Sequence, residues 1–171
     1  LYARLRQVED PGNVLIIPHA HEAGDWNYSD PEMQRLSEIY SGHGSFEYFG
    51  NRFLKRGFRM GFIAASDDHS GHPGYAPALV STRGGLAAVY SPTLDRDGIW
   101  AGMKNRATYA SSGKRPVLQF SAGGRIPGES VDAGAAPTFN ARVLATAPID
   151  HIDVIHNGVP EYSKDFLAPK P

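Results

Sequence analysis

Asp67 and His69 lie in the segment of this chain whose residue types are best suited to chemistry, the stretch 66–74. This stretch directly follows the short apolar run 62–65, which is typical of a buried strand. Because alternate side chains of an extended chain point the same way, Asp67 and His69 are expected to share a face that Asp68 does not. A carboxylate oxygen beside an imidazole nitrogen suits Zn, Mn or Fe. The alternative interpretation is a solvated loop in which an Asp caps a turn.

Two earlier apolar runs deliver further candidate ligands. The run 14–17 leads to His19 and His21, and the run 36–40 contains Glu38. A carboxylate in a buried strand is costly unless it lies next to a cation, which favours metal ligation by Glu38. The carboxyl ends of neighbouring parallel strands lie at one edge of a sheet, so these side chains are expected to converge. The predicted metal ligands are His19, Glu38, His43, Asp67 and His69. For each of them, a structural or loop role is the alternative.

Helices are predicted between these strands from capping residues and helical spacing. One begins at the Asp30 cap, a second runs from Ser45 to Gly57, and a third runs from Thr93 to about Asn105. A fourth strand is predicted at 86–90. Such alternation of strands and helices predicts an α/β fold with a parallel sheet or barrel.

The residue pattern of the sequence changes near Lys114. Apolar alternation and clusters of Gly, Pro and Ala predict strands at 117–120, 138–144 and 151–155. Asn157-Gly158 is a strong hairpin signal. We therefore predict two parts: residues 1–115, an α/β portion that carries the metal ligands, and residues 116–171, an antiparallel β appendage that begins a small sandwich.

The composition narrows the classes of function. The chain has 171 residues, 41% of them hydrophobic, and a net charge of −1, which predicts a globular core and argues against a basic nucleic-acid-binding surface. No run of 18 apolar residues occurs, so no membrane span is expected. The chain has no cysteine, so a metal must be held by His, Asp and Glu, and the cell compartment stays open. The start at Leu1 predicts an excerpt from a longer polypeptide.

Several longer segments together resemble a known family. They are 17–19, 37–47, 61–74, 85–90 and 106–113. With these segments the chain resembles the PHP (polymerase and histidinol phosphatase) superfamily of metal-dependent phosphoesterases. Within that superfamily it is most similar to the DUF3604 group of PHP-like proteins.

The resemblance implies a fold and a set of roles. The fold would be the C-terminal part of a distorted (β/α)7 barrel, because the superfamily's opening His-x-His motif has no counterpart here. Asp67 and His69 would be the closing metal pair, His19 a mid-chain ligand, and Glu38 or His43 a ligand from the next strand. Thr108, Ser111 and Arg115 would bind the phosphate of a substrate.

The predicted function is a metal-dependent hydrolase, a phosphoesterase that cleaves a small phosphorylated substrate with a metal-bound hydroxide. His43 and Asp67 would be catalytic, and the complete protein would hold more than one divalent ion (Mn, Zn or Fe). No serine-elbow, phosphate-loop or dinucleotide motif offers another chemistry. The alternatives are a metal-dependent hydrolase of a carbonyl or sulfate ester, and a non-catalytic PHP-like binding protein.

Overall fold

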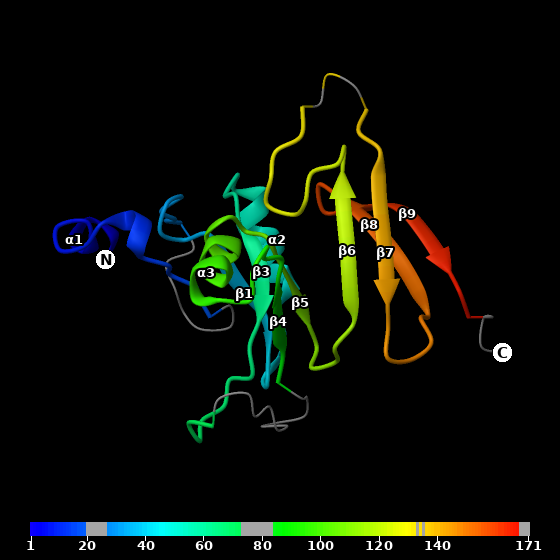
Figure 1. Cartoon of the computed structure of the whole chain (residues 1–171), viewed down its shortest axis with the longest axis horizontal. Helices are drawn as coiled ribbons and strands as arrows, with labels where there is room; N and C mark the ends of the chain where they lie inside the picture. Colours follow the sequence, from blue (N-terminus) through cyan, green and yellow to red (C-terminus); the bar gives the residue numbers. More distant parts are fainter. Residues whose placement is uncertain (20–26, 73–83, 133, 135, 168–171) are drawn as a thin grey trace.

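Short strands and three α-helices make up the part of the chain before residue 112. The computed structural model describes residues 1–19, 27–72, 84–132, 134 and 136–167. In chain order the elements of this part are α1 (Tyr2–Leu5), the 3₁₀ turn η1 (Pro11–Asn13), β1 (Leu36–Ser41), β2 (Gly44–Ser45), α2 (Glu47–Lys55), β3 (Gly61–Ala64), β4 (Leu86–Val89), α3 (Arg96–Lys104) and β5 (Thr108–Ser111). Figure 1 shows these elements grouped around β1 and β3.

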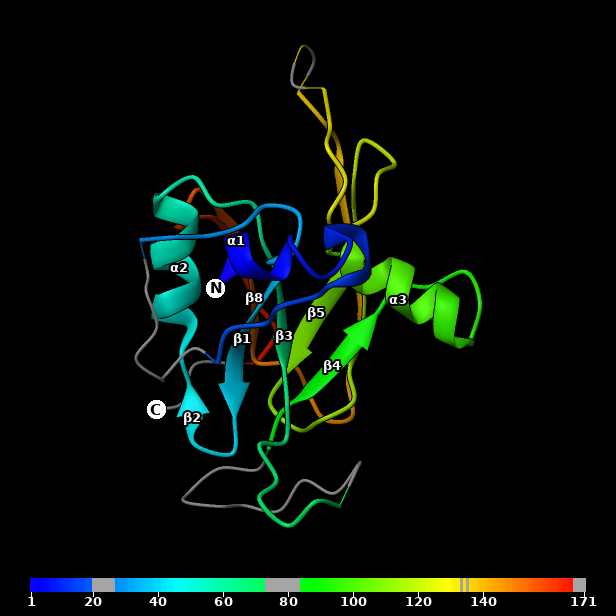
Figure 2. The ribbon, with the colours of Figure 1, turned by 90° about the vertical axis from the view of Figure 1, so that its left-hand side faces the viewer.

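The strands of this part lie side by side, but they form separate hydrogen-bonded sheets. β1 pairs in parallel with β3 and antiparallel with β2, while β4 pairs antiparallel with β5. The Thr108 hydroxyl at the start of β5 donates to the carbonyl of Phe62 in β3, at 2.9 Å. β5 therefore lies against β3, and Figure 2 shows α2 and α3 at opposite flanks of the group.

The remaining strands form two antiparallel pairs. β6 (Val117–Ala122) pairs with β7 (Phe139–Leu144), and β8 (His151–His156) pairs with β9 (Val159–Asp165). Asn157 and Gly158 join β8 to β9 with φ angles of 53° and 80°, the conformation of a type I′ hairpin turn. The hairpin predicted from Asn-Gly is thus present.

The predicted (β/α)7 barrel is wrong. Within the described residues, β1–β3 is the one parallel pair of strands, and the other pairs are antiparallel. Residues 14–17 form no strand, although Ile16 N–H donates to the carbonyl of Met33 at 2.8 Å. A strand–helix–strand order does not determine strand direction: α3 carries the chain back so that β5 runs against β4. The prediction failed because pairing direction is set by contacts distant in sequence.

All three predicted helix caps are also wrong. Residues 31–33 form a turn and no helix, although Asp30 still accepts from the backbone N–H groups of Glu32 and Met33, at 3.0 Å each. Ser45 belongs to β2, so α2 begins two residues later. Asp95 caps α3 by accepting from Gly98 N–H at 2.7 Å, in place of Thr93.

A small core holds β1 and β3 against their covering elements. Its buried apolar residues are Met33, Leu36, Phe53, Met60, Ile63, Ala64 and Ala107. Gly50 allows α2 to approach the strands closely, because a Cβ atom there would lie 2.8 Å from Phe62 and 3.0 Å from Ile39. Any side chain at this position would push α2 away from the two strands that carry the candidate site.

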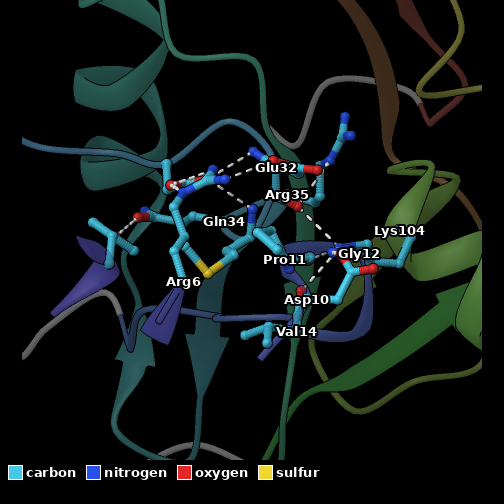
Figure 3. Close-up of polar contacts among 12 residues, drawn as sticks. Arg6, Asp10, Pro11, Gly12, Val14, Glu32, Gln34, Arg35 and Lys104 are labelled. Carbon is cyan, nitrogen blue, oxygen red and sulfur yellow. Dashed lines mark hydrogen bonds and ion pairs between the residues drawn. The ribbon is translucent and has the colours of Figure 1, made fainter. Parts of the chain in front are cut away.

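The segment before β1 is fixed by two basic side chains. Arg6 makes a two-pronged contact with the Asp30 carboxylate, with nitrogen–oxygen distances of 2.8 to 3.1 Å. Lys104 in α3 donates to the carbonyls of Pro11, Val14 and Glu32, at 3.1, 2.9 and 3.0 Å (Figure 3). An ammonium group has three donors, and here all three donate to backbone carbonyl oxygens of the segment before β1.

Two tyrosine hydroxyls connect β6 to the preceding strands. The Tyr90 hydroxyl donates to the carbonyl of Leu118 at 2.5 Å and accepts from Phe120 N–H at 3.3 Å. The Tyr109 hydroxyl donates to the carbonyl of Pro116 at 2.8 Å, and the two rings pack edge to face. β6 is thereby held beside β4 and β5.

Among the described residues, no helix has both the length and the apolar character that a membrane crossing requires.

Candidate metal centre

The Asp67 carboxylate is the centre of the candidate site. Its Oδ2 lies 3.2 Å from Nε2 of His19 and 3.1 Å from Nε2 of His43. Its Oδ1 lies 3.1 Å from Nε2 of His69. The imidazoles come from three separate segments of the chain, so the structure brings together residues that are far apart in sequence.

Glu38 lies behind His19 as seen from Asp67. Its Oε1 is 2.7 Å from Nδ1 of His19, and the two residues form an isolated parallel bridge through the backbone. Metal-binding histidines commonly place their second nitrogen against a carboxylate, which orients the ring and increases the basicity of the first nitrogen. Glu38 thus touches the predicted ligand His19 instead of Asp67.

An extra residue in β1 places Glu38 and Ser41 on the same side of the strand. Glu38 pairs with Ile63 and Tyr40 with Ala64, so Ile39 is bulged out of the register. Residues three apart in a regular strand point to opposite faces. The bulge at Ile39 reverses this alternation, and bulges commonly redirect side chains beside functional sites.

Asp67 itself has an unusual backbone conformation. Its φ is 54°, in the left-handed region, which Asp and Asn adopt more readily than other residues with a side chain. β3 ends at Ala64, and this turn directs the Asp67 carboxylate back toward the end of β1. Strained backbone of this kind concentrates at functional sites.

Ser41 is a site residue that the sequence analysis missed. It is fully buried; its hydroxyl donates to Oδ2 of Asp67 at 3.2 Å and accepts from His43 N–H at 3.1 Å. The signal in the sequence was a small polar residue at the end of an apolar run, directly before Gly42 and His43.

Burial and the neighbouring imidazoles shift the pKa values of Glu38 and Asp67 in opposite directions. Burial raises the pKa of Glu38; the nearby His19 ring opposes this rise, and the charge of Asp67 adds to it. Burial also acts to raise the pKa of Asp67, but the rings of His19, His69 and His43 outweigh it, so that the pKa is lowered. Of the two carboxylates, Asp67 is therefore the one whose surroundings favour the ionised form.

The donor set fits a divalent cation. His43, Asp67 and His69 each offer one ligand atom, and these atoms all lie within 4.8 Å of one another. Two ligand atoms bound tetrahedrally to zinc at 2.0–2.1 Å lie about 3.3 Å apart, close to the 3.1 Å separations between Asp67 and these two histidines. Nitrogen and oxygen donors of this kind suit Zn, Mn or Fe.

The predicted substrate-binding residues are placed differently from one another. Thr108 is buried, and its hydroxyl donates a hydrogen bond to the Phe62 carbonyl of β3. Ser111 pairs with Leu86 at the opposite end of β5, and its hydroxyl donates to the carbonyl of Lys114. Arg115 is exposed in the β5–β6 connection. The structure brings Ser111 and Arg115, and not Thr108, to the end of the strands where β3 leads into Asp67.

The other histidines that the structure describes lie outside this cluster. His151 and His156 are exposed on β8, where they face Asp153 and Glu161. His72 is exposed, and its backbone N–H donates to Asp68 at 2.7 Å. The candidate His21 lies outside the described residues.

Comparison with known proteins supports part of the resemblance. Residues 74–143 match the model of a family described as a protein of unknown function, DUF3604. The resemblance to the DUF3604 group is thus supported.

The chain is also similar to three uncharacterized chlamydial proteins. It is 28% identical over 156 residues to one from Chlamydia pneumoniae, covering 75% of this chain and 25% of that protein. For Chlamydia trachomatis serovar D the identity is 27% over 169 residues, and for Chlamydia muridarum 26% over 170; each covers 78% of this chain and 26% of the relative. The chain thus spans about a quarter of the length of these relatives. No solved structure matches it.

Proposed function

We propose that this chain carries the metal centre of a divalent-metal-dependent hydrolase, and that its substrate is a small phosphorylated compound. The observation that carries the proposal is the contact of one ionised carboxylate, Asp67, with the imidazoles of His19, His43 and His69 at 3.1–3.2 Å. Of these residues, His43, Asp67 and His69 each offer a ligand atom within 4.8 Å of the others, and the ring of His69 is exposed to solvent.

Each residue of the proposed centre would have a separate role. A divalent cation at this position would supply a lowered pKa for water and a positive charge for a phosphoryl oxygen. Asp67 holds the three rings in place through its two oxygens, Oδ1 toward His69 and Oδ2 toward His19 and His43. Glu38 orients His19 from behind. We place His43 and Asp67 next to the reacting phosphate, because both contribute to the candidate ligand group.

Two basic residues at the same end of the strands support a phosphorylated substrate. Lys114 and Arg115 are exposed in the connection between β5 and β6, which begins directly after Ser111. Figures 1 and 2 show this connection at the same end of the strands as the segment that follows β3. Cationic side chains near a metal centre attract phosphate and stabilise the charge that develops during transfer.

The proposed ligands are of the same types as those of PHP-type phosphoesterases. The proposal does not include the barrel fold of that superfamily. Ester and amide carbonyls, and sulfate esters, are polarised by the same cations, so the substrate assay must distinguish them.

The test uses the intact protein. Its metal content is measured, and hydrolysis of a general aryl phosphate is assayed with Mn²⁺ and Zn²⁺, with aryl sulfate and carboxylate esters in parallel. Asp67→Asn keeps a residue that tolerates φ of 54° and removes the charge, so metal binding and hydrolysis should be lost. His151→Gln, on the exposed face of β8, is the matched control and should retain both. A protein that binds neither ion, or one in which Asp67→Asn retains full activity, contradicts the proposal.

A further inference from the structure

We propose that Ser41 is the positioning residue of this centre, an inference that rests on the proposed metal site. Its hydroxyl joins the Asp67 carboxylate to the backbone of the segment that carries His43, with distances of 3.2 and 3.1 Å. Ser41 would act through Asp67 and His43 without touching the cation or the substrate.

The hydroxyl is suited to both contacts at once. A serine side chain has one donor hydrogen and two acceptor lone pairs. Here the hydrogen points to Oδ2 of Asp67, the oxygen that also faces His19 and His43, while a lone pair accepts the His43 N–H. The backbone hydrogen bond from Ala65 N–H to the Tyr40 carbonyl, at 3.1 Å, already joins the end of β1 to the residue after β3. The Ser41 hydroxyl adds the contact that reaches the Asp67 side chain itself.

Two backbone features make this contact decisive. Asp67 has a φ of 54°, a conformation that persists only when the surrounding structure holds it. The bulge at Ile39 brings Ser41 to the side of β1 on which Glu38 contacts His19. Without the Ser41 hydroxyl, Asp67 keeps its imidazole neighbours but loses its contact with β1.

The same strand supplies a matched control. Ser37 is also in β1 and is also fully buried, yet its hydroxyl oxygen has no hydrogen-bond partner among the residues that the structure describes. Ser37→Ala and Ser41→Ala remove the same atom from the same strand at the same burial. They differ in whether that atom touches Asp67 and His43.

The experiment compares the two variants in the intact protein. Mn²⁺ and Zn²⁺ affinities are measured by titration calorimetry, and Co²⁺ is used as a spectroscopic probe of ligand geometry. Ser41→Ala should weaken metal binding by about 10- to 100-fold, the range seen when outer hydrogen bonds to metal ligands are removed. It should also shift the visible Co²⁺ absorption. Ser37→Ala should change neither, and equal affinities and spectra in both variants would overturn the inference.

A readout without metal separates this inference from the proposed function. In the metal-free protein, hydrogen exchange at the His43 amide should become faster in Ser41→Ala than in Ser37→Ala, because that amide loses its acceptor. A wild-type protein that binds no Mn²⁺, Zn²⁺ or Co²⁺ contradicts the proposed function and, with it, a metal-positioning role. Unchanged His43 exchange in Ser41→Ala contradicts the role of Ser41 whatever the metal result.

Discussion

Oε1 of Glu38 lies 2.7 Å from Nδ1 of His19, on the opposite edge of the ring from Nε2, which faces Asp67. A carboxylate beside Nδ1 favours the form of the imidazole that carries its hydrogen on Nδ1 and a lone pair on Nε2, which is the form that binds a cation through Nε2. Glu38 thus contacts the predicted ligand His19 and lies outside the candidate ligand group. This arrangement can be tested separately from Asp67.

Glu38→Gln should weaken Mn²⁺ or Zn²⁺ binding by about 10- to 100-fold while the protein remains folded, because the amide keeps the shape and loses the charge that orients His19. Calorimetric titration measures the change. Glu9→Gln removes an exposed carboxylate near the start of the chain and serves as the control. Unaltered affinity in Glu38→Gln would show that His19 needs no orienting carboxylate.

Asp30 should contribute to stability in a pH-dependent way. Burial acts to raise its pKa, but the Arg6 guanidinium and the N–H groups of Met33 and Glu32 outweigh it, so the pKa of Asp30 is lowered. The contribution is therefore complete above the unfolded-state pKa of about 3.9 and is lost as the pH falls through the lower folded-state value.

Urea unfolding of the wild type and Asp30→Ala at several pH values measures this effect. At pH 6 the variant should be less stable by about 1–3 kcal/mol, because Arg6 and the N–H groups of Glu32 and Met33 lose their charged acceptor. The difference should shrink once the pH is below 4. Glu9→Ala is the exposed control. A difference that stays constant down to pH 2.5 would contradict the ionised role of Asp30.

Lys104→Met should destabilise the segment before β1. The substitution keeps the apolar stem but leaves the carbonyls of Pro11, Val14 and Glu32 without their charged donor, at an expected cost of about 1–3 kcal/mol. Amide hydrogen exchange of residues 12–16 should become faster. Lys55→Met, in the last turn of α2, is the control. Equal stability of both variants would mean that water replaces the ammonium without loss.

Tyr90→Phe should loosen β6. The variant loses the donor to Leu118 and the acceptor for Phe120, and we expect a loss of about 1 kcal/mol together with faster exchange of the Phe120 amide. Tyr162→Phe in the exposed strand β9 controls for the loss of a hydroxyl. Should exchange in β6 remain at the wild-type rate, the hydroxyl contacts do not hold this strand.

The sequence allowed the site to be predicted better than the fold. His19, Glu38 and Asp67 were predicted to converge because the carboxyl ends of neighbouring parallel strands meet at one edge of a sheet. The structure brings Glu38 and Asp67 into contact with His19, and the metal-binding role of these residues stays a prediction. A buried carboxylate requires a partner of opposite charge or a cation, so the apolar run around Glu38 was enough to predict that it has such a partner. The Asn157-Gly158 turn was also predictable, because few other residue pairs tolerate two positive φ angles.

The barrel and the role of Ser41 could not be obtained in the same way. Whether β5 runs with or against β4 depends on pairing between distant segments, which periodicity does not contain. The role of Ser41 depends on the bulge at Ile39, because regular alternation would place Ser41 and Glu38 on opposite faces. The four residues 38–41 are too few for their alternation of polar and apolar side chains to reveal a bulge at Ile39.

The bulge at Ile39 limits how β1 can change length over evolution. Deleting one residue between Glu38 and Ser41, or inserting one there, would turn either the carboxylate or the hydroxyl toward α2, and the imidazole cluster would lose a contact. Active relatives should therefore keep the same number of residues between these two positions, even where the neighbouring loops differ in length. A homologue with an alignment gap at this point is expected to lack the proposed metal centre.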